Sequence, residues 1–227
     1  INKGKHMGNS LTIFDLDNTL IQGDSSTVWS QFMVREGLAT QKGYLAREAR
    51  LMADYDRGEM NIVDYVALIQ APLAGIPKSD VDALVARCVR EAILPRVYPQ
   101  AWELIRRLQA EGEQMLIISA SVSLLVQAVA AALEIDQALG IDVAMVDGGY
   151  SGVIAGIPSY QQGKVARLAQ WREAHPQYDG EVTFYTDSIN DLPLCLHADR
   201  VRLVNPCPQL QAAGAGYGWP VLSWRLE

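Results

Sequence analysis

Short apolar runs alternate with helical patterns along the second half of the chain, and this alternation most constrains the fold. The runs 115–118, 182–185 and 201–204 have the length and composition of buried strands, and stripes of apolar residues at helical spacing separate them. Such alternation predicts a parallel sheet covered on both faces, with functional groups at the carboxyl ends of its strands. We therefore expect an α/β protein with a Rossmann-like doubly wound parallel sheet.

Residues 23–94 interrupt this alternation. The stretch contains no convincing strand, and apolar residues such as Val28 and Phe32 recur in it at helical spacing. A connection of this length is far too long for an ordinary loop between a strand and a helix. We therefore expect residues 7–22 and 95–227 to form the core and residues 23–94 to form an inserted helical module.

The first six residues and the histidines carry no expected function. Residues 1–6 are interpreted as a cloning remnant, because they precede a methionine, Met7, that would serve as a natural start. His6 is therefore not a candidate ligand. His175 and His197 do not lie beside a motif, so we expect them to be solvated or structural.

Two carboxylates two residues apart follow the apolar run 11–14. At a strand end, Asp15 could attack an electrophile while Asp17 moves a proton. The same Asp-x-Asp pattern is common in ordinary turns and helix caps, where short polar side chains satisfy free backbone groups. The motif Asp-Leu-Asp-Asn-Thr alone therefore leaves both interpretations open.

Further polar residues stand at comparable places along the chain. Ser119 ends one apolar run, Lys164 opens a helical pattern, and Asp187 ends another run. Asn190 and Asp191 follow shortly after. Each of these residues could be an ordinary cap, a turn residue or a solvated lysine. Their order and their attachment to apolar runs favour one shared site.

Taken in this order, the four segments resemble the motifs of the haloacid dehalogenase superfamily, and the resemblance covers almost the whole chain. Members of that superfamily mostly transfer phosphoryl groups through an aspartyl-phosphate intermediate. The inserted helices are similar to the cap of the phosphoserine phosphatase-like branch, subfamily IB, which lies between the first and second motifs. The resemblance implies that residues 23–94 are a helical cap on a catalytic core.

The resemblance also implies a catalytic role for each motif residue. Asp15 would be the nucleophile, and Asp17 would protonate the leaving group and then activate water. Ser119 and Lys164 would bind the phosphoryl group, with Ala120 beside them in the substrate-binding segment.

Mg²⁺ is the cofactor that the resemblance implies. Asp15, Asp187 and the backbone carbonyl of Asp17 would bind it, with Asn190 and Asp191 in support, and such oxygen ligands suit Mg²⁺. The net charge of −7 argues against a nucleic-acid surface, and it makes a bound cation more necessary for an anionic substrate.

Asp24 is the candidate for recognition of the leaving group. By resemblance it stands where phosphoserine phosphatases carry a glutamate that meets the substrate amine. The register places Ala67 where those enzymes carry an arginine for the substrate carboxylate. The pattern therefore favours histidinol phosphate, or another amine-bearing metabolite, over phosphoserine. Asp24 could instead cap the first helix of the insertion, with Ser25 and Ser26 beside it.

The leading hypothesis is an Mg²⁺-dependent phosphatase that hydrolyses a small-molecule phosphate monoester, and phosphoserine phosphatase is an alternative. A haloacid dehalogenase would need neither a proton donor at Asp17 nor a metal at Asp187. Two more hypotheses stay open, namely transfer of the phosphoryl group to another acceptor and a catalytically inactive binding module.

Composition agrees with an enzyme of this kind. The 227 residues, of which 49% are hydrophobic, suffice for a substantial core. No apolar stretch has the length of a membrane span, and the chain opens with no signal-peptide pattern. Its three cysteines lack metal-binding or redox spacing. We expect a cytoplasmic protein with reduced thiols and with no nucleic-acid or membrane partner, and the pattern indicates no particular oligomeric state.

Overall fold

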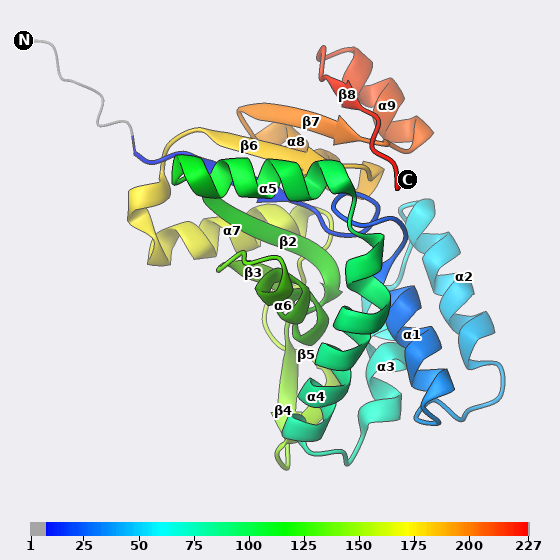
Figure 1. Cartoon of the computed structure of the whole chain (residues 1–227). Coiled ribbons are helices and arrows are strands. Elements are labelled where there is room, and N and C mark those ends of the chain that lie inside the picture. Colours follow the sequence, from blue (N-terminus) through cyan, green and yellow to red (C-terminus); the bar gives the residue numbers. More distant parts are fainter. Residues whose placement is uncertain (1–7, 227) are drawn as a thin grey trace, which may run out of the picture.

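The computed structural model describes residues 8–226 and shows a six-stranded sheet with helices on both faces (Figure 1). Every neighbouring pair of strands in this sheet is parallel, which confirms the predicted fold class. Across the sheet, the strands are β3 (Ala138–Ile141), β2 (Gln114–Val122), β1 (Leu11–Phe14), β6 (Val182–Thr186), β7 (Arg200–Val204) and β8 (Val221–Leu222). The expected cloning remnant, residues 1–6, lies outside the described residues, and so does Met7.

Strand register brings the ends of the central strands to one edge of the sheet. Phe14, the last residue of β1, lies opposite Ile117 of β2 and Tyr185 of β6. β2 continues to Val122 because β3 still pairs with it beyond the end of β1. Ser119 therefore lies inside a strand, and the expectation that the strand ends there was wrong.

The helices of the core lie on the two faces of this sheet. Leu11 and Ile13 of β1 pack in a cluster with Leu168 of α7, whereas Phe14 packs in a second cluster with Ile105 of α5. Strand side chains alternate between faces in this way because successive residues point to opposite sides. The core helices are α5 (Pro99–Glu111), α6 (Ser123–Ala132), α7 (Gln162–Ala174), α8 (Leu192–His197) and α9 (Pro208–Ala215), with short turns η4 (Pro176–Tyr178) and η5 (Ile189–Asp191).

Residues 23–94 are helical and contain no strand, as expected. Their apolar stripes are buried and join the cluster that also contains Ile105, so this segment shares its core with one face of the sheet. The elements are α1 (Ser25–Arg35), α2 (Tyr44–Asp56), α3 (Ile62–Gln70) and α4 (Lys78–Cys88), with short turns η1 (Ala71–Leu73), η2 (Val89–Ile93) and η3 (Leu94–Arg96). The helix α2 buries only Tyr44 and Glu48 completely, so it is the most weakly anchored of the four.

A hairpin follows β3, and the sequence indicates it by two strand-like runs, 141–146 and 150–155, on either side of Gly148 and Gly149. The strands β4 (Val143–Val146) and β5 (Gly149–Ile154) pair with each other in antiparallel fashion, outside the main sheet. Asp147 and Gly148 join them, and both have positive φ angles, which a tight hairpin turn requires. The hairpin packs against α3 through β5 and lies beside the helical segment in Figure 1.

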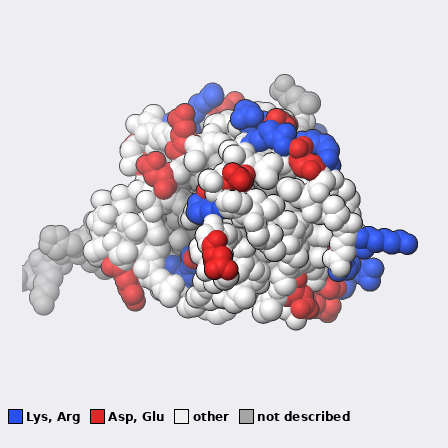
Figure 2. All heavy atoms as spheres, turned by 90° about the horizontal axis from the view of Figure 1, so that it is seen from below, with Lys and Arg blue, Asp and Glu red and all other residues white. Residues whose placement is uncertain are grey.

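On the face seen in Figure 2, acidic and basic side chains are interspersed. Within residues 8–226, no helix has both the length and the apolar character needed to cross a membrane. Cys88 and Cys195 are buried, Cys207 is partly exposed, and all three are free thiols.

Candidate active site

Asp15 and Lys164 form the centre of the candidate site. Asp15 directly follows β1 and is 3% exposed, while Lys164, in the first turn of α7, is 0% exposed. The Lys164 Nζ atom donates to Asp15 Oδ1 at 2.9 Å and lies 2.7 Å from Asp191 Oδ1. Burial lowers the pKa of Lys164, but the two carboxylates outweigh burial and raise it, so the lysine is a cation.

Asp187 follows β6 and lies on the other side of Asp15. The hydroxyl of Thr19 links the two, because its Oγ1 lies 3.1 Å from Asp187 Oδ1 and 3.4 Å from Asp15 Oδ2. Burial, followed by the charges of Asp15 and Asp191, raises the pKa of Asp187 well above its usual range. A cation between Asp15 and Asp187 would favour the ionised form of both carboxyl groups.

The oxygen atoms at this point fit Mg²⁺. Among residues 8–226, no group of three or more Asp, Glu, His or Cys side chains is placed to hold a metal ion. An ion beside Asp15 and Asp187 would therefore need backbone carbonyl and water oxygens as further ligands. Mg²⁺ accepts such a shell, because it usually keeps several waters and binds one or two carboxylates.

Asp17 is held apart from this group, towards β2 and the start of α1. Its Oδ1 accepts from the Ser25 backbone N–H at 2.5 Å, and its Oδ2 accepts from Ser121 Oγ at 2.9 Å and Ser119 Oγ at 3.4 Å. Burial raises the pKa of Asp17, and the bonds from Ser25 and Ser121 oppose this effect. A carboxyl group with a raised pKa is suited to donating and accepting a proton.

Ser119 and Ala120 lie in the part of β2 that extends beyond β1. The Ser119 hydroxyl accepts from the Ser121 backbone N–H at 3.1 Å, and the Ser119 carbonyl accepts from Ser159 Oγ at 2.6 Å. These bonds fix the orientation of Ser119 next to Asp17. The structure thus brings the predicted residues Asp15, Asp17, Ser119 and Lys164 together at one edge of the sheet.

The two residues predicted to support a metal site make different contacts. Asp191 holds Lys164, and its other oxygen accepts from Thr186 Oγ1 at 2.7 Å. Asn190 bonds instead to the helical segment, because its Nδ2 donates to the Tyr55 carbonyl at 2.8 Å. The Asn190 side chain has no hydrogen bond to Asp15 or Asp187 within the described residues.

A cavity of about 470 Å³ opens beside these groups, between the helical segment and the core. Four carboxylates line it, and none of its described lining residues is Lys or Arg. The four are Asp17, Asp24, Asp56 and Asp187. The cavity is therefore strongly acidic, which favours cations over anions near its wall.

The position of Asp24 agrees with both roles that the sequence left open, which are capping of the first helix and recognition of the leaving group. It is the N-cap of α1, where its Oδ1 accepts from the Thr27 backbone N–H at 2.9 Å, and it also lines the cavity. Burial raises its pKa well above the usual range, and the charges of Asp17 and Glu48 raise it further. The capping contact and a contact with a leaving group are thus compatible in this geometry.

Ala67 does not line this cavity. It is exposed on α3 and lines a separate hollow between α2 and α3 with Leu51. The register that places Ala67 beside the leaving group was therefore wrong. Neighbouring positions on a helix differ by about 100° in direction, so the burial of Tyr65 and Val66 turns position 67 outwards.

Sequence reasoning missed the residues by which the helical segment reaches the core. Tyr55 lines the cavity together with Ser188, and its backbone carbonyl accepts from Asn190. Burial, followed by the charges of Asp15, Asp191 and Asp187, raises the pKa of Tyr55 well above its usual range. Gln161, directly before α7, bonds to the helical segment as well. Neither residue belongs to a motif, so only the fold reveals its position.

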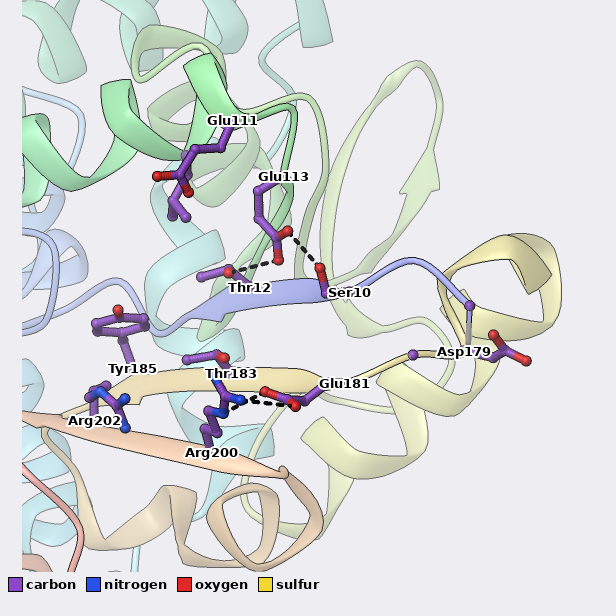
Figure 3. A pocket seen from close by; sticks show the side chains of 13 residues that line it. Ser10, Thr12, Glu111, Glu113, Asp179, Glu181, Thr183, Tyr185, Arg200 and Arg202 are labelled. Atoms are coloured by element: carbon purple, nitrogen blue, oxygen red, sulfur yellow. Dashed lines mark hydrogen bonds and ion pairs between the residues drawn. The ribbon is translucent and has the colours of Figure 1, made fainter. Parts of the chain in front are cut away.

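A second cleft lies at the opposite end of the sheet and has a volume of about 790 Å³ (Figure 3). Its side chains bind mainly to one another. Ser10 and Thr12 donate to Glu113, and Arg200 pairs with Glu181. No predicted site residue lines this cleft. Because ligands of open α/β sheets bind at the carboxyl ends of the strands, the acidic cavity is the candidate active site.

Comparison with known proteins agrees with this geometry. A family model described as haloacid dehalogenase-like hydrolase matches residues 12–195. A histidinol-phosphatase from Neisseria meningitidis serogroup C is 33% identical, and the match covers 95% of this chain and 99% of the relative. A phosphoserine phosphatase from Mycobacterium tuberculosis is 26% identical over 94% of this chain and 70% of the relative.

Solved structures show the same fold. A protein of unknown function from Bordetella pertussis Tohama I has a TM-score of 0.85 and 31% identity, with 95% of this chain and 98% of that chain covered. A phosphoserine phosphatase in a phospho-aspartyl intermediate analogue form has a TM-score of 0.66 and 18% identity, with 90% of each chain covered. The second likeness concerns the fold alone.

Proposed function

We propose that this chain, which belongs to the haloacid dehalogenase-like hydrolase family, hydrolyses a small amine-bearing phosphate monoester with Asp15 as its nucleophile. The chain is a phosphoric monoester hydrolase of the phosphoserine phosphatase-like type. Asp15 lies between Lys164 and Asp187, beside an acidic cavity, and this placement most directly supports Asp15 as the nucleophile.

In the first step, a carboxylate oxygen of Asp15 attacks phosphorus. The bond between phosphorus and the leaving oxygen breaks, and Asp17, as a carboxylic acid, gives its proton to that oxygen. Lys164, which already donates to Asp15 Oδ1, neutralises charge that accumulates on the phosphoryl oxygens. The products of this step are the free alcohol and an aspartyl-phosphate at Asp15.

In the second step, water attacks the phosphorus of the aspartyl-phosphate. Asp17, now a carboxylate, takes a proton from the water, and the bond between phosphorus and Asp15 breaks. Inorganic phosphate leaves, and both aspartates return to their starting forms. Ser25 and Ser121 keep the Asp17 carboxyl group in one orientation during both proton transfers.

Asp15, Asp187 and the backbone carbonyl of Asp17 would hold Mg²⁺, and the ion would supply positive charge to offset the negative charge of the phosphoryl oxygens. Thr19 orients both carboxylates towards this position through its hydroxyl. We propose in addition that residues 23–94 act as a cap on the core, because Asn190 of η5 donates to the Tyr55 carbonyl of α2.

The acidic cavity supports a leaving group that carries a cation. A bound amine would favour the ionised form of Asp24, and Asp56 would attract it as well, whereas a substrate carboxylate would find no Lys or Arg in the described lining. Histidinol phosphate has an amine and no carboxylate. The relative from Neisseria meningitidis is named a histidinol-phosphatase, which supports the same substrate. Phosphoserine is the alternative, and the relative from Mycobacterium tuberculosis favours it.

The test is release of phosphate from histidinol phosphate and from phosphoserine, with Mg²⁺ and in excess EDTA. We expect a higher kcat/KM for histidinol phosphate and no turnover without the metal. A preference for phosphoserine would contradict the substrate proposal alone. Full activity in EDTA would contradict the metal-dependent mechanism.

A further inference from the structure

We infer that Gln161 is a positioning residue, which couples the carboxyl-terminal end of α2 to the placement of Lys164. Gln161 lies directly before α7, three residues before Lys164. Its Nε2 atom lies 3.1 Å from the Gly58 carbonyl, 3.1 Å from Asn190 Oδ1 and 3.1 Å from the Tyr160 hydroxyl. One side-chain amide thus joins the loop before α7, the loop after β6 and the turn after α2.

The backbone of Gln161 is strained. Its φ of 50° and ψ of −124° lie in a region that residues with a side chain rarely adopt. Such a conformation persists only where surrounding contacts maintain it. The Lys164 backbone N–H donates to the Gln161 carbonyl at 3.1 Å, so the strained residue belongs to the first turn of the helix that carries Lys164.

Asn190, in the loop after β6, also binds the carboxyl-terminal end of α2. Its Nδ2 donates to the Tyr55 carbonyl at 2.8 Å, while its Oδ1 accepts from Gln161. The two amides therefore bind carbonyl groups of residues 55 and 58. Because α2 buries only Tyr44 and Glu48 completely, these polar contacts hold an end of the helix that apolar packing fixes weakly.

The consequence is a link between α2 and the charge at the reaction centre. When residues 55–58 sit against the core, Gly58 and Asn190 keep Gln161 in its strained conformation and α7 presents Lys164 to Asp15. When they move away, Gln161 can relax, and the first turn of α7 shifts with it. Only the expected effect on catalysis rests on the proposed function. The contacts themselves exist without substrate.

The structural test is amide hydrogen exchange of the full chain without substrate. Gln161→Met keeps the length of the side chain and removes its donors, and Gln177→Met is the matched control at an exposed glutamine. We expect exchange at residues 55–60 and 162–166 to rise together in Gln161→Met, by about 5- to 30-fold for the loss of one or two hydrogen bonds. Gln177→Met should leave both segments unchanged.

Gln161→Asn provides the conservative variant. Asparagine keeps the amide and tolerates a positive φ, so it should restore part of the protection in both segments. A rise in only one segment, or in neither, would overturn the coupling. A rise throughout the sheet, with a large fall in Tm, would show a general structural role and would overturn it equally.

Kinetics give a second, separate readout. Lys164 acts on the phosphoryl group, which every substrate shares, so Gln161→Met should lower kcat by a similar factor for histidinol phosphate and for an aryl phosphate. A raised KM confined to the amine-bearing substrate would place Gln161 in the pocket wall and refute the link to Lys164. If the wild-type chain hydrolyses neither compound, the proposed function fails while the exchange experiment still decides the coupling.

Discussion

Replacement of Lys164 by methionine tests whether the carboxylate cluster depends on one buried cation. Methionine approximates the length of the lysine stem, so the substitution removes charge with little change in packing. Lys164 is 0% exposed and lies 2.9 Å from Asp15 Oδ1 and 2.7 Å from Asp191 Oδ1. Without the lysine, two buried carboxylates lose their shared partner.

The expected loss of stability is large at neutral pH. Removal of one partner from a buried ion pair typically costs about 3–5 kcal/mol. For a chain of this size, each kcal/mol lowers Tm by about 2–4 °C, so Lys164→Met should melt about 6–20 °C lower in EDTA. Lys42→Met, at an exposed position, is the matched control and should melt close to the wild type.

The loss should shrink in acid. Burial raises the pKa of Asp191 to about 6 even though Lys164 opposes this effect, so without the lysine it must rise further. A carboxyl group with a raised pKa in the folded state stabilises the fold below its unfolded pKa, and that contribution is lost as the pH rises through the folded pKa. At pH 5 Asp191 should therefore be mostly neutral in the variant, and the difference in Tm should be smaller than at pH 7.5.

Thermal unfolding followed by circular dichroism at pH 5 and pH 7.5 measures both effects. A Tm deficit equal at the two pH values would show that lost packing, rather than unpaired charge, causes the destabilisation. A Tm indistinguishable from that of Lys42→Met would refute the view that Lys164 compensates the cluster. Addition of Mg²⁺ should recover part of the deficit, because the ion would offset the charge of Asp15.

Three further outcomes are expected. Asp15→Asn should abolish phosphate release and leave the circular dichroism spectrum unchanged. Asp17→Asn should retain substrate binding and lower kcat by about 10²–10⁴-fold. Near-normal turnover by either variant would remove that residue from the mechanism. Activity lost in EDTA should return on addition of Mg²⁺, as followed by phosphate release. Asp24→Ala should raise KM for histidinol phosphate more than for an aryl phosphate. Loss of the helix cap should lower the free energy of unfolding, measured in urea, by about 1 kcal/mol. Equal kinetic losses with both substrates would leave Asp24 with the capping role alone.

The sequence predicted the core and the meeting of the motif residues because both depend on local patterns. Apolar runs of strand length determine which segments enter the sheet, and the parallel arrangement brings their carboxyl ends together whatever the connections are. Asp15 and Asp187 could therefore be placed beside each other from patterns of a few residues. The strand order β2-β1-β6 places the segments before Ser119 and Asp187 on either side of the first strand.

Contacts between the inserted helices and the core could not be predicted in this way. The carbonyls of Tyr55 and Gly58 are ordinary backbone groups, and only the docking of α2 selects them as partners of Asn190 and Gln161. The error at Ala67 has a related cause, because a helical stripe can be read from the residues but the rotation of α3 relative to the cavity cannot.

The central position of β1 affects how the chain folds during synthesis. β1 precedes the other described strands in the chain, yet its neighbours begin at Gln114 and Val182. The bond between Asp15 and Lys164 spans 149 residues, and that between Thr19 and Asp187 spans 168. Contacts so distant in sequence form slowly, because a long loop must close before they stabilise the fold. During translation, we expect β1 to remain without its partners until β2 emerges, and the nascent chain to be inactive until β6 and its loop have joined the sheet.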